Sequence, residues 1–330
     1  LPRIPTEVAL GPAGLRAASG TADGRVALRL RDPESFRLQL AGISDADTRH
    51  GEGVAALVFA PTGTRLASAG DDGSIVLWNT ADGSAAGPVF QHGAGLLAAL
   101  ALAPDGRTVA VAGERGARIW DGLEGLPGPM LGAGREVTAV ALDAAGNRAF
   151  TGTPEGLVES WDVASGERLW FSALDAPVDS IALSADGASV AAGGATGLVR
   201  AWGMGPAGRA ASLALAAPVL HLSFSPDGHA LLAQTPGWLH RLGFEQGRLQ
   251  VLASRTLPAS VPPAGWRSAD AAGTRVAMVG GAHGETMAVL DFIRAESPPD
   301  DWTVDLEAWQ ARLQLYFDAE GELRQEPAGE

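Results

Sequence analysis

A short segment in which apolar and polar residues alternate recurs along the chain at intervals of about 40 residues. Such alternation is typical of a β-strand with one buried face. The clearest copies are GSIVLWN (73–79), GARIWDG (116–122), GLVESWD (156–162) and GLVRAWG (197–203). The pattern therefore predicts a strand at the same place in each of several equivalent units.

Tryptophan marks the end of these strands. The four residues, spaced by 42, 41 and 41 positions, are Trp78, Trp120, Trp161 and Trp202, which we call the tryptophan ladder. Three further copies keep the frame without a tryptophan, and they are GRVALRL (24–30), GWLHRLG (237–243) and ETMAVLDF (285–292). In these copies the ladder position falls on Arg29 or Leu30, on Leu242, and near Leu290.

Another apolar strand precedes most copies and runs into a tight turn. The segments are ALVFAPTG (56–63), LALAPDG (100–106), AVALDAAG (139–146), IALSADG (181–187) and HLSFSPDG (221–228). Pro fixes φ and Gly accepts positive φ, so these endings favour turns, and a further strand such as RLASAG (65–70) follows. A period of about 40 residues corresponds to a blade of four antiparallel strands. Counting frames, we predict an all-β fold, a seven-bladed β-propeller over residues 1–294.

The end of the chain follows a different pattern. Residues 295–301, which contain Ser-Pro-Pro-Asp-Asp, are predicted to be a linker. Apolar residues then recur at a helical period and predict a C-terminal amphipathic helix in a tail of residues 302–330. Its apolar stripe is Trp302, Leu306, Trp309, Leu313 and Tyr316 or Phe317. Gly321 ends this helix or the hairpin-like YFDAEGELR (316–324), and the stripe must be covered by the propeller's side, a neighbouring domain or another subunit.

Composition and charge restrict the partners. The net charge is −14 and the pI is near 4.8, which disfavours nucleic acid and anionic membrane surfaces, since both attract basic proteins. No run of 18 apolar residues occurs, so we expect no direct membrane insertion by this chain. We expect a cytoplasmic location, with export or a tether in a longer chain as the alternative. The chain begins with Leu1, and we expect it to be a processed product or part of a longer, bacterial multidomain polypeptide.

Two residue types are absent. Without cysteine the chain has no disulfides, thiolate metal sites or cysteine nucleophiles. All 24 basic residues are arginine, which excludes a Walker A loop, a protein-kinase ATP site and a lysine Schiff base. The glycine-rich pieces GGATG (193–197) and GGAHGE (280–285) each join two strands and do not open a helix, so they lack the geometry of phosphate loops.

No catalytic constellation emerges from the other polar residues. His50 and His92 are in register with the repeat, and His221 opens an inner strand, where we interpret it as a structural histidine, with a position facing the central channel as the alternative. The acids Asp71 and Asp72 lie in a turn, where Asp bonds the local backbone. The inner strands are expected to start at structural positions, namely Val54, Leu96, Val137, Val178 and Val219. We therefore predict no enzyme activity, no catalytic residues, no metal and no cofactor.

The second copy resembles the WD40-repeat family most closely, through His50, VAALVFAPTG, LASAGDDG and IVLW. This resemblance extends over about residues 5–292 and implies a hydrogen-bonded structural tetrad of His50, Ser68, Asp72 and Trp78. The third copy keeps His92 and Trp120 but has Glu114 and Arg115 in its turn. The fourth has Thr151, Glu155, Trp161 and Asp162 without a histidine. In such propellers the N-terminus usually supplies the outer strand of the last blade, although residues 1–6 are short for that role.

The resemblance also implies that loops on one rim form the docking face. The candidate rim contacts are Arg49, Asp71, Glu114, Arg115, Arg135, Glu136, Glu155, Asp175, Gln234, Trp238 and His283. Two functions remain open at this point. One is a non-enzymatic scaffold or sensor that binds a protein or peptide on the rim, within an assembly or beside an upstream domain of the same polypeptide. The other is a ligand-binding or catalytic propeller with a metal or hydrolase site in its channel.

Overall fold

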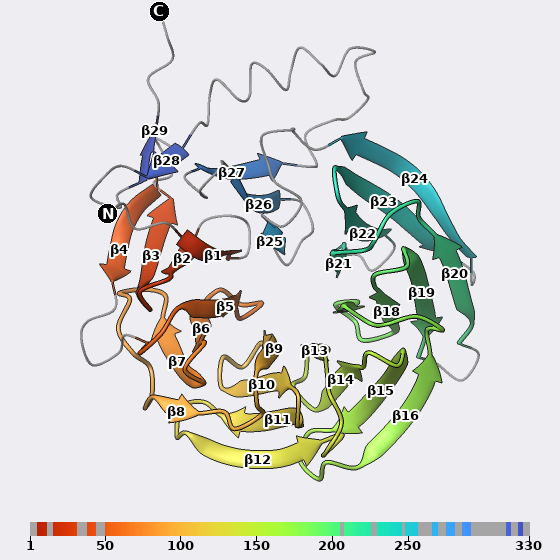
Figure 1. The fold of residues 1–330 in the computed structure, drawn as a ribbon, viewed down its shortest axis with the longest axis horizontal. Helices are drawn as coiled ribbons and strands as arrows, with labels where there is room; N and C mark the ends of the chain where they lie inside the picture. The colour runs from red at the N-terminus through yellow and green to blue at the C-terminus, as the bar shows by residue number, and fades with distance from the viewer. Residues whose placement is uncertain are drawn as a thin grey trace, which may run out of the picture.

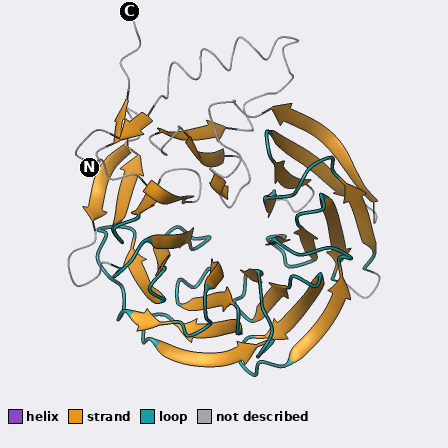
Figure 2. Ribbon diagram, viewed as in Figure 1, coloured by secondary structure: helices purple, strands orange, loops and turns teal. Residues whose placement is uncertain are grey.

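A computed structural model describes most of the chain. The described residues are 5–11, 16–31, 38–43, 50–204, 208–225, 230–245, 248–256, 266–269, 275–280, 286–291, 315–317 and 323–325. They form seven antiparallel sheets arranged in a ring around a central axis (Figure 1). Figure 2 shows strands and loops in the described part of the chain, and no helix.

Blades 1 to 3 each contain four strands that follow one another in the sequence. Blade 1 consists of β1 (Pro5–Leu10), β2 (Arg16–Thr21), β3 (Val26–Arg31) and β4 (Leu38–Ile43). Blade 2 consists of β5 (Val54–Phe59), β6 (Arg65–Gly70), β7 (Ser74–Asn79) and β8 (Phe90–Gln91). Blade 3 consists of β9 (Leu97–Leu102), β10 (Thr108–Gly113), β11 (Gly116–Asp121) and β12 (Leu126–Leu131).

The next three blades repeat this order, and the seventh differs. Blade 4 consists of β13 (Ala139–Leu142), β14 (Arg148–Gly152), β15 (Leu157–Asp162) and β16 (Arg168–Ala173). Blade 5 consists of β17 (Ser180–Leu183), β18 (Ser189–Gly193), β19 (Leu198–Gly203) and β20 (Ala210–Ala214). Blade 6 consists of β21 (His221–Phe224), β22 (Ala230–Thr235), β23 (Trp238–Glu245) and β24 (Arg248–Thr256). Blade 7 consists of β25 (Trp266–Ala269), β26 (Arg275–Gly280), β27 (Thr286–Asp291), β28 (Leu315–Phe317) and β29 (Leu323–Gln325).

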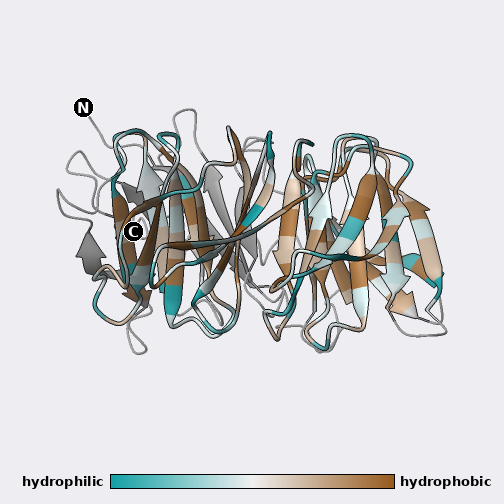
Figure 3. Cartoon of the chain, turned by 90° about the horizontal axis from the view of Figure 1, so that it is seen from below, coloured by the Kyte–Doolittle hydropathy of each residue, from teal (hydrophilic) through white to brown (hydrophobic). Residues whose placement is uncertain are grey.

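The first strand of each blade lies nearest the axis and the fourth lies at the periphery (Figure 1). In the side view of Figure 3 the hydrophobic stretches follow the strands, and the loops gather at two opposite ends of the ring. The predicted all-β propeller with seven blades is therefore confirmed.

The tryptophan ladder occupies one register position throughout. In blades 2 to 5 each ladder residue lies on the third strand and pairs with a small or aliphatic residue near the start of the second strand. The pairs are Trp78 with Leu66, Trp120 with Val109, Trp161 with Ala149, and Trp202 with Val190. In blade 1 this position is Arg29, opposite Ala17, and in blade 6 it is Leu242, opposite Leu231. The register thus selects Arg29 over Leu30.

The core is divided among the interfaces between blades. The buried cluster between blades 1 and 2 contains Val26, Leu57 and Trp78, and the next one contains Leu77, Val109 and Trp120. Equivalent clusters join blades 3 and 4, 4 and 5, and 5 and 6. Because blades 1 to 6 bury apolar faces against one another, this part of the ring is held together by sheet-on-sheet packing.

Blade 7 takes its outer strand from the C-terminal tail. β28 pairs with β27, with Tyr316 opposite Thr286, and β29 pairs with β28. The expectation that the N-terminus supplies this strand is wrong, because β1 is the inner strand of blade 1, where it pairs with β2 and lies beside β5 and β25.

The tail differs in part from the predicted helix. Tyr316 and Phe317 belong to β28, so the helical stripe does not extend to them, while the hairpin-like pattern that begins there forms β28 and β29. The other stripe positions, Trp302, Leu306, Trp309 and Leu313, lie outside the described residues. The division into residues 1–294, 295–301 and 302–330 remains a prediction, although β28 and β29 share the sheet of blade 7.

Candidate functional site

Two sets of loops form one rim of the ring, which we call the loop rim. One set joins the second and third strands of a blade, and the other leads from a fourth strand to the first strand of the next blade. Backbone hydrogen bonds tie the two sets together, such as Asp71 N–H to Gly53 O at 2.8 Å and Arg115 N–H to Ala94 O at 2.9 Å. The loop rim is therefore a surface of short loops that are fixed to one another by backbone hydrogen bonds.

Most of the candidate rim contacts lie on the loop rim and are exposed. They are Asp71, Glu114, Arg115, Arg135, Glu136, Glu155, Asp175 and Trp238. Asp175 adopts a positive φ of 64° and accepts a hydrogen bond from Arg200 at 3.2 Å. Arg49 and His283 lie outside the described residues.

Gln234 is not a rim contact. Strand β22 extends through Thr235, so Gln234 belongs to the sheet, opposite His221, and is only 1% exposed. Its side-chain oxygen and nitrogen have no hydrogen-bond partner in the structure. Blades 2 to 5 have small pairs at the same register, namely Ala56 and Ala69, Ala99 and Ala112, Ala139 and Gly152, and Ser180 and Gly193.

Leu96 differs from the structural role expected of it, because its side chain is 72% exposed on the loop rim. The preceding Gly93 and Gly95 adopt φ values of +68° and +87°, a region that glycine enters without a Cβ clash. These glycines let Ala94 take a fully buried position and turn Leu96 outward. The corresponding positions in other blades are buried as expected, at Val54, Val137, Val178 and Val219.

The structure brings His50, Ser68, Asp72 and Trp78 into one buried network, joined by Ser74. Trp78 Nε1 donates to Ser68 Oγ at 2.8 Å, and Ser68 Oγ lies 2.7 Å from His50 Nε2. His50 Nδ1 lies 2.5 Å from Ser74 Oγ, which donates to Asp72 Oδ1 at 2.5 Å. A neutral His50 with its proton on Nδ1 satisfies every group in this chain.

The pKa values within this network follow from burial and hydrogen bonding. Burial lowers the pKa of His50, although the nearby Asp72 carboxylate opposes this effect. Burial alone would raise the pKa of Asp72, but hydrogen bonds from Ser74 and the Gly51 N–H outweigh it and leave that pKa below its usual value. Both groups are therefore in the forms that the hydrogen bonds require at neutral pH. Sequence reasoning missed Ser74, whose position directly after the Asp-Gly turn was the available signal.

The other blades satisfy the ladder position differently. Trp161 Nε1 donates to Thr151 Oγ1 at 2.8 Å, whereas Trp120 Nε1 is buried without a hydrogen-bond partner in the structure. Trp120 stacks on Phe90 with ring centroids 4.7 Å apart. In blade 1, Arg29 is buried and donates to Ser19 Oγ at 2.8 Å.

A fully buried carboxylate lies beneath the loop rim in blade 4. Glu159 on β15 accepts from Arg135 at 2.8 Å and from Arg168 at 2.7 Å, and both arginines are partly exposed. Arg135, a candidate rim contact, is thus held by an internal partner. Glu159 was missed, although a glutamate two residues before a ladder tryptophan stands on the buried face of its strand.

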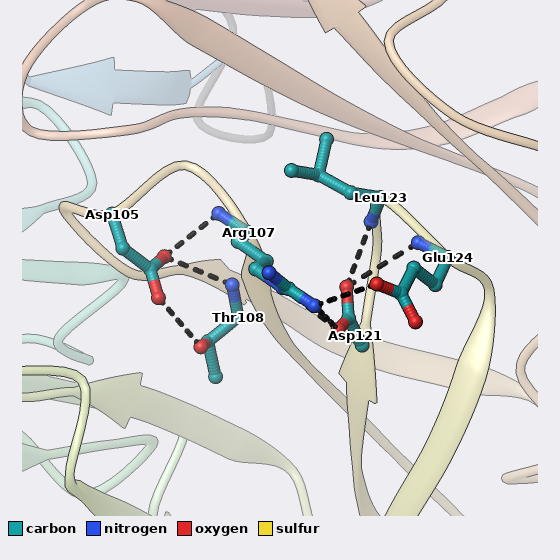
Figure 4. Close-up of polar contacts among 6 residues, drawn as sticks. All are labelled: Asp105, Arg107, Thr108, Asp121, Leu123 and Glu124. Atoms are coloured by element: carbon teal, nitrogen blue, oxygen red, sulfur yellow. Dashed lines mark hydrogen bonds and ion pairs between the residues drawn. The ribbon is translucent and has the colours of Figure 1, made fainter.

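The opposite rim uses its charges to stabilise its own turns (Figure 4). Asp105 accepts from the N–H groups of Arg107 and Thr108, and from the Thr108 hydroxyl at 2.7 Å. The Arg107 guanidinium pairs with Asp121 and with Glu124, and its hydrogen bond holds the pKa of Asp121 below the usual value. By contrast, Asp71, Glu114, Arg115 and Glu136 on the loop rim make no side-chain hydrogen bond or ion pair in the structure.

The described residues around the channel contain few titratable side chains. Burial lowers the pKa of His221 to about 4, so this imidazole is neutral at physiological pH. Asp179 precedes the inner strand of blade 5, and burial raises the pKa of its carboxyl. Among the described residues, no group of three or more histidine and acidic side chains is arranged to hold a metal ion. The described part of the chain also contains no helix long and apolar enough to cross a membrane.

Comparison with known families connects the buried network with the repeat. Residues 46–79, which include His50, Ser68, Asp72, Ser74 and Trp78, match the family model described as WD domain, G-beta repeat. Blade 2 is thus similar to one WD40 repeat, and it belongs to a propeller of seven antiparallel sheets. The match falls on blade 2, the blade in which the hydrogen-bonded network is complete. A comparison with curated proteins found no match to this chain.

Proposed function

We propose that this propeller is a non-enzymatic interaction module that binds a protein or peptide on its loop rim and acts as a scaffold or sensor within a larger assembly. WD40 repeats generally mediate protein–protein interactions, which supports a protein partner. The observation that carries the proposal is the contrast between the two rims. On the loop rim, Glu114 and Arg115 have no side-chain partner and lie near the exposed Leu96, whereas acids of the opposite rim bind their own turns.

Such a surface has the composition of an interface. Interfaces combine an apolar centre with a polar periphery, and their strongest contacts favour Trp, Tyr and Arg. Leu96, Leu220 and Trp238 are large apolar side chains exposed on the loop rim. Glu114 and Arg115 follow directly after β10 and lie close to Leu96 in the chain's fold, since Arg115 N–H bonds to Ala94 O.

The experiment compares two variants that remove the same charge from opposite rims. The propeller and its variants would be used to isolate partners from the native cell, and the affinity for each partner would be measured by calorimetry. Glu114→Ala with Glu136→Ala should weaken binding by about tenfold or more, because both side chains lie on the loop rim. Glu124→Ala with Glu167→Ala, on the opposite rim, should leave the affinity within about twofold. Equal losses in the two double variants would sink the proposal.

A further inference from the structure

One sector of the loop rim carries no charge. Residues 210–225 and 230–240, which include the rim loops of blade 6, contain no aspartate, glutamate or arginine. The corresponding rim loops of blades 2 to 5 all contain charged residues, such as Asp71, Glu114, Glu155 and Asp175. Because charged side chains are costly to desolvate, a partner that covers this sector pays a smaller desolvation cost than one that covers the charged loops.

Two large apolar side chains are exposed in this sector. Leu220 is 37% exposed and Trp238 is 44% exposed. They lie at the same end of blade 6, because Leu220 N–H donates to Gln234 O at 2.8 Å and Trp238 pairs with Thr235, the next residue of β22. We call Leu220, Trp238 and His240 the blade 6 ledge.

The aromatic part of the ledge is held in place by its neighbours. Trp238 and His240 are stacked, with ring centroids 6.3 Å apart and an interplanar angle of 16°. His240 Nδ1 lies 2.8 Å from Ser254 Oγ, and its Nε2 lies 3.2 Å from Thr235 Oγ1. Both ring nitrogens are thus engaged within the blade, so a partner would find the rings already oriented and would lose less conformational entropy on binding.

The tryptophan is not needed to fill a standard position of the blade. Trp238 stands four residues before the ladder position, Leu242, on β23. The residues at the same place in blades 2 to 5 are Ser74, Gly116, Leu157 and Leu198. A propeller blade therefore forms with small or aliphatic residues here, and a large exposed aromatic ring adds contact area for another molecule.

An exposed acid without a cationic partner, Asp179, stands in the neighbouring blade 5 at the register position of Leu220. Each of these two residues lies one residue before the inner strand of its blade. The two inner strands are joined at this height by Leu222 N–H, which donates to Ser180 Oγ at 2.9 Å. Asp179 is exposed, and partial desolvation raises the pKa of its carboxyl although a backbone hydrogen bond from Ala195 opposes the shift.

We propose that the blade 6 ledge binds a segment of a partner protein in which an apolar side chain contacts Leu220 and Trp238 and a neighbouring arginine or lysine pairs with Asp179. The net charge of −14 favours a basic segment, since it attracts cations over distance. This inference rests on the proposed function and assigns the chemistry of the partner and the part of the rim that it contacts.

The test uses synthetic decapeptides and the full chain. In a Gly-Ser background, one position is Leu, Phe or Gly, and a neighbouring position is Arg, Gln or Glu. Binding is followed through the indole N–H resonance of Trp238, assigned by its loss in Trp238→Phe. Leu-Arg and Phe-Arg peptides should shift this resonance and bind at least tenfold more tightly than peptides with Gly or Glu at the respective positions.

Substitutions then separate the two contacts. Trp238→Ala should weaken the Leu-Arg and Phe-Arg peptides at least tenfold, whereas Phe171→Ala, which removes a 60% exposed aromatic ring on β16, should have no effect. Asp179→Asn should abolish the preference for Arg over Gln. An unchanged preference, or equal effects of Trp238→Ala and Phe171→Ala, would overturn the proposal.

Other occupants would be recognised in the same experiments. If sedimentation shows a dimer that dissociates in Trp238→Ala, the ledge binds a second copy of this chain and the proposal is wrong. If no peptide binds and iodide fails to quench Trp238 fluorescence, the chain itself covers the ledge, which also overturns it. If an isolated partner depends on Glu114 and Glu136 but not on Trp238, the ledge proposal fails while the proposed function of the loop rim stands.

Discussion

The indole N–H of Trp161 donates to the hydroxyl of Thr151 at 2.8 Å, which repeats in blade 4 the bond between Trp78 and Ser68 in blade 2. The ladder tryptophan of blade 3, Trp120, has no such partner, because Val111 stands at the position of Ser68 and Thr151. One repeat position is thus satisfied by a hydroxyl in two blades and left without a hydrogen bond in a third. Substitutions at these hydroxyl positions can therefore measure what this hydrogen bond contributes to stability.

Thr151→Val should destabilise the propeller. Valine keeps the shape of threonine but removes the acceptor, so the indole N–H of Trp161 is left buried and unpaired. We expect a loss of about 1–3 kcal/mol in the free energy of unfolding. Denaturant unfolding followed by tryptophan fluorescence measures it, and an unchanged midpoint would show that Trp161 finds another acceptor.

Val111→Thr should stabilise the propeller. The new hydroxyl would stand where Thr151 stands in blade 4 and would accept from Trp120 Nε1. The expected gain is about 0.5–1.5 kcal/mol, the typical net contribution of one hydrogen bond. Val109→Thr, at the residue that pairs with Trp120, serves as the control and should destabilise, because it buries a hydroxyl without the partner. A loss of stability in Val111→Thr as large as in the control would contradict the prediction.

In the ion cluster of blade 4, removing the arginines should cost more stability than neutralising Glu159. Removing both arginines, with Arg135→Ala and Arg168→Ala, leaves the buried carboxylate of Glu159 without a cation and should cost about 3–5 kcal/mol. Glu159→Gln keeps the shape and leaves arginines that reach water, so its cost should be about 1–3 kcal/mol. Thermal unfolding of the two variants gives the comparison. A larger loss of stability in Glu159→Gln than in the double arginine variant would contradict this prediction, because it would show that the unpaired arginines cost more than the unpaired carboxylate.

Stability should fall as pH falls from 6.5 towards 4. The pKa of His221 is lowered from 6.5 to about 4, so the unfolded state binds more protons than the folded state in this range. The contribution of His221 is present above its unfolded pKa and is lost progressively below it, by an amount on the order of 1–3 kcal/mol. His221→Asn should flatten the pH dependence of the melting temperature between pH 4 and 6.5. Parallel curves for the variant and the native chain would show that His221 does not cause the decline.

Much of the fold and part of the site were predictable from local patterns. The alternation before Trp78, the turn at residues 61–63 and the spacing to Trp120 are properties of neighbouring residues, and they suffice to place strands and count blades. Trp238 was predictable as a rim residue for the same reason, since the Pro-Gly before it marks a turn. Local patterns do not show whether a side chain is buried by another blade, and this is why Gln234 and Leu96 were misplaced.

Sequence by itself determined the repeated strand order, the turns and the seven blades of this protein, because strand periodicity and turn chemistry act within a few residues. Only the tertiary structure decided that β28 from the tail completes blade 7, that Ser74 joins His50 to Asp72, and that Arg135 and Arg168 meet at Glu159. These contacts connect residues from different strands, loops or blades. Their geometry depends on how the blades pack around the ring, and the periodic pattern that builds each blade carries no information about that packing.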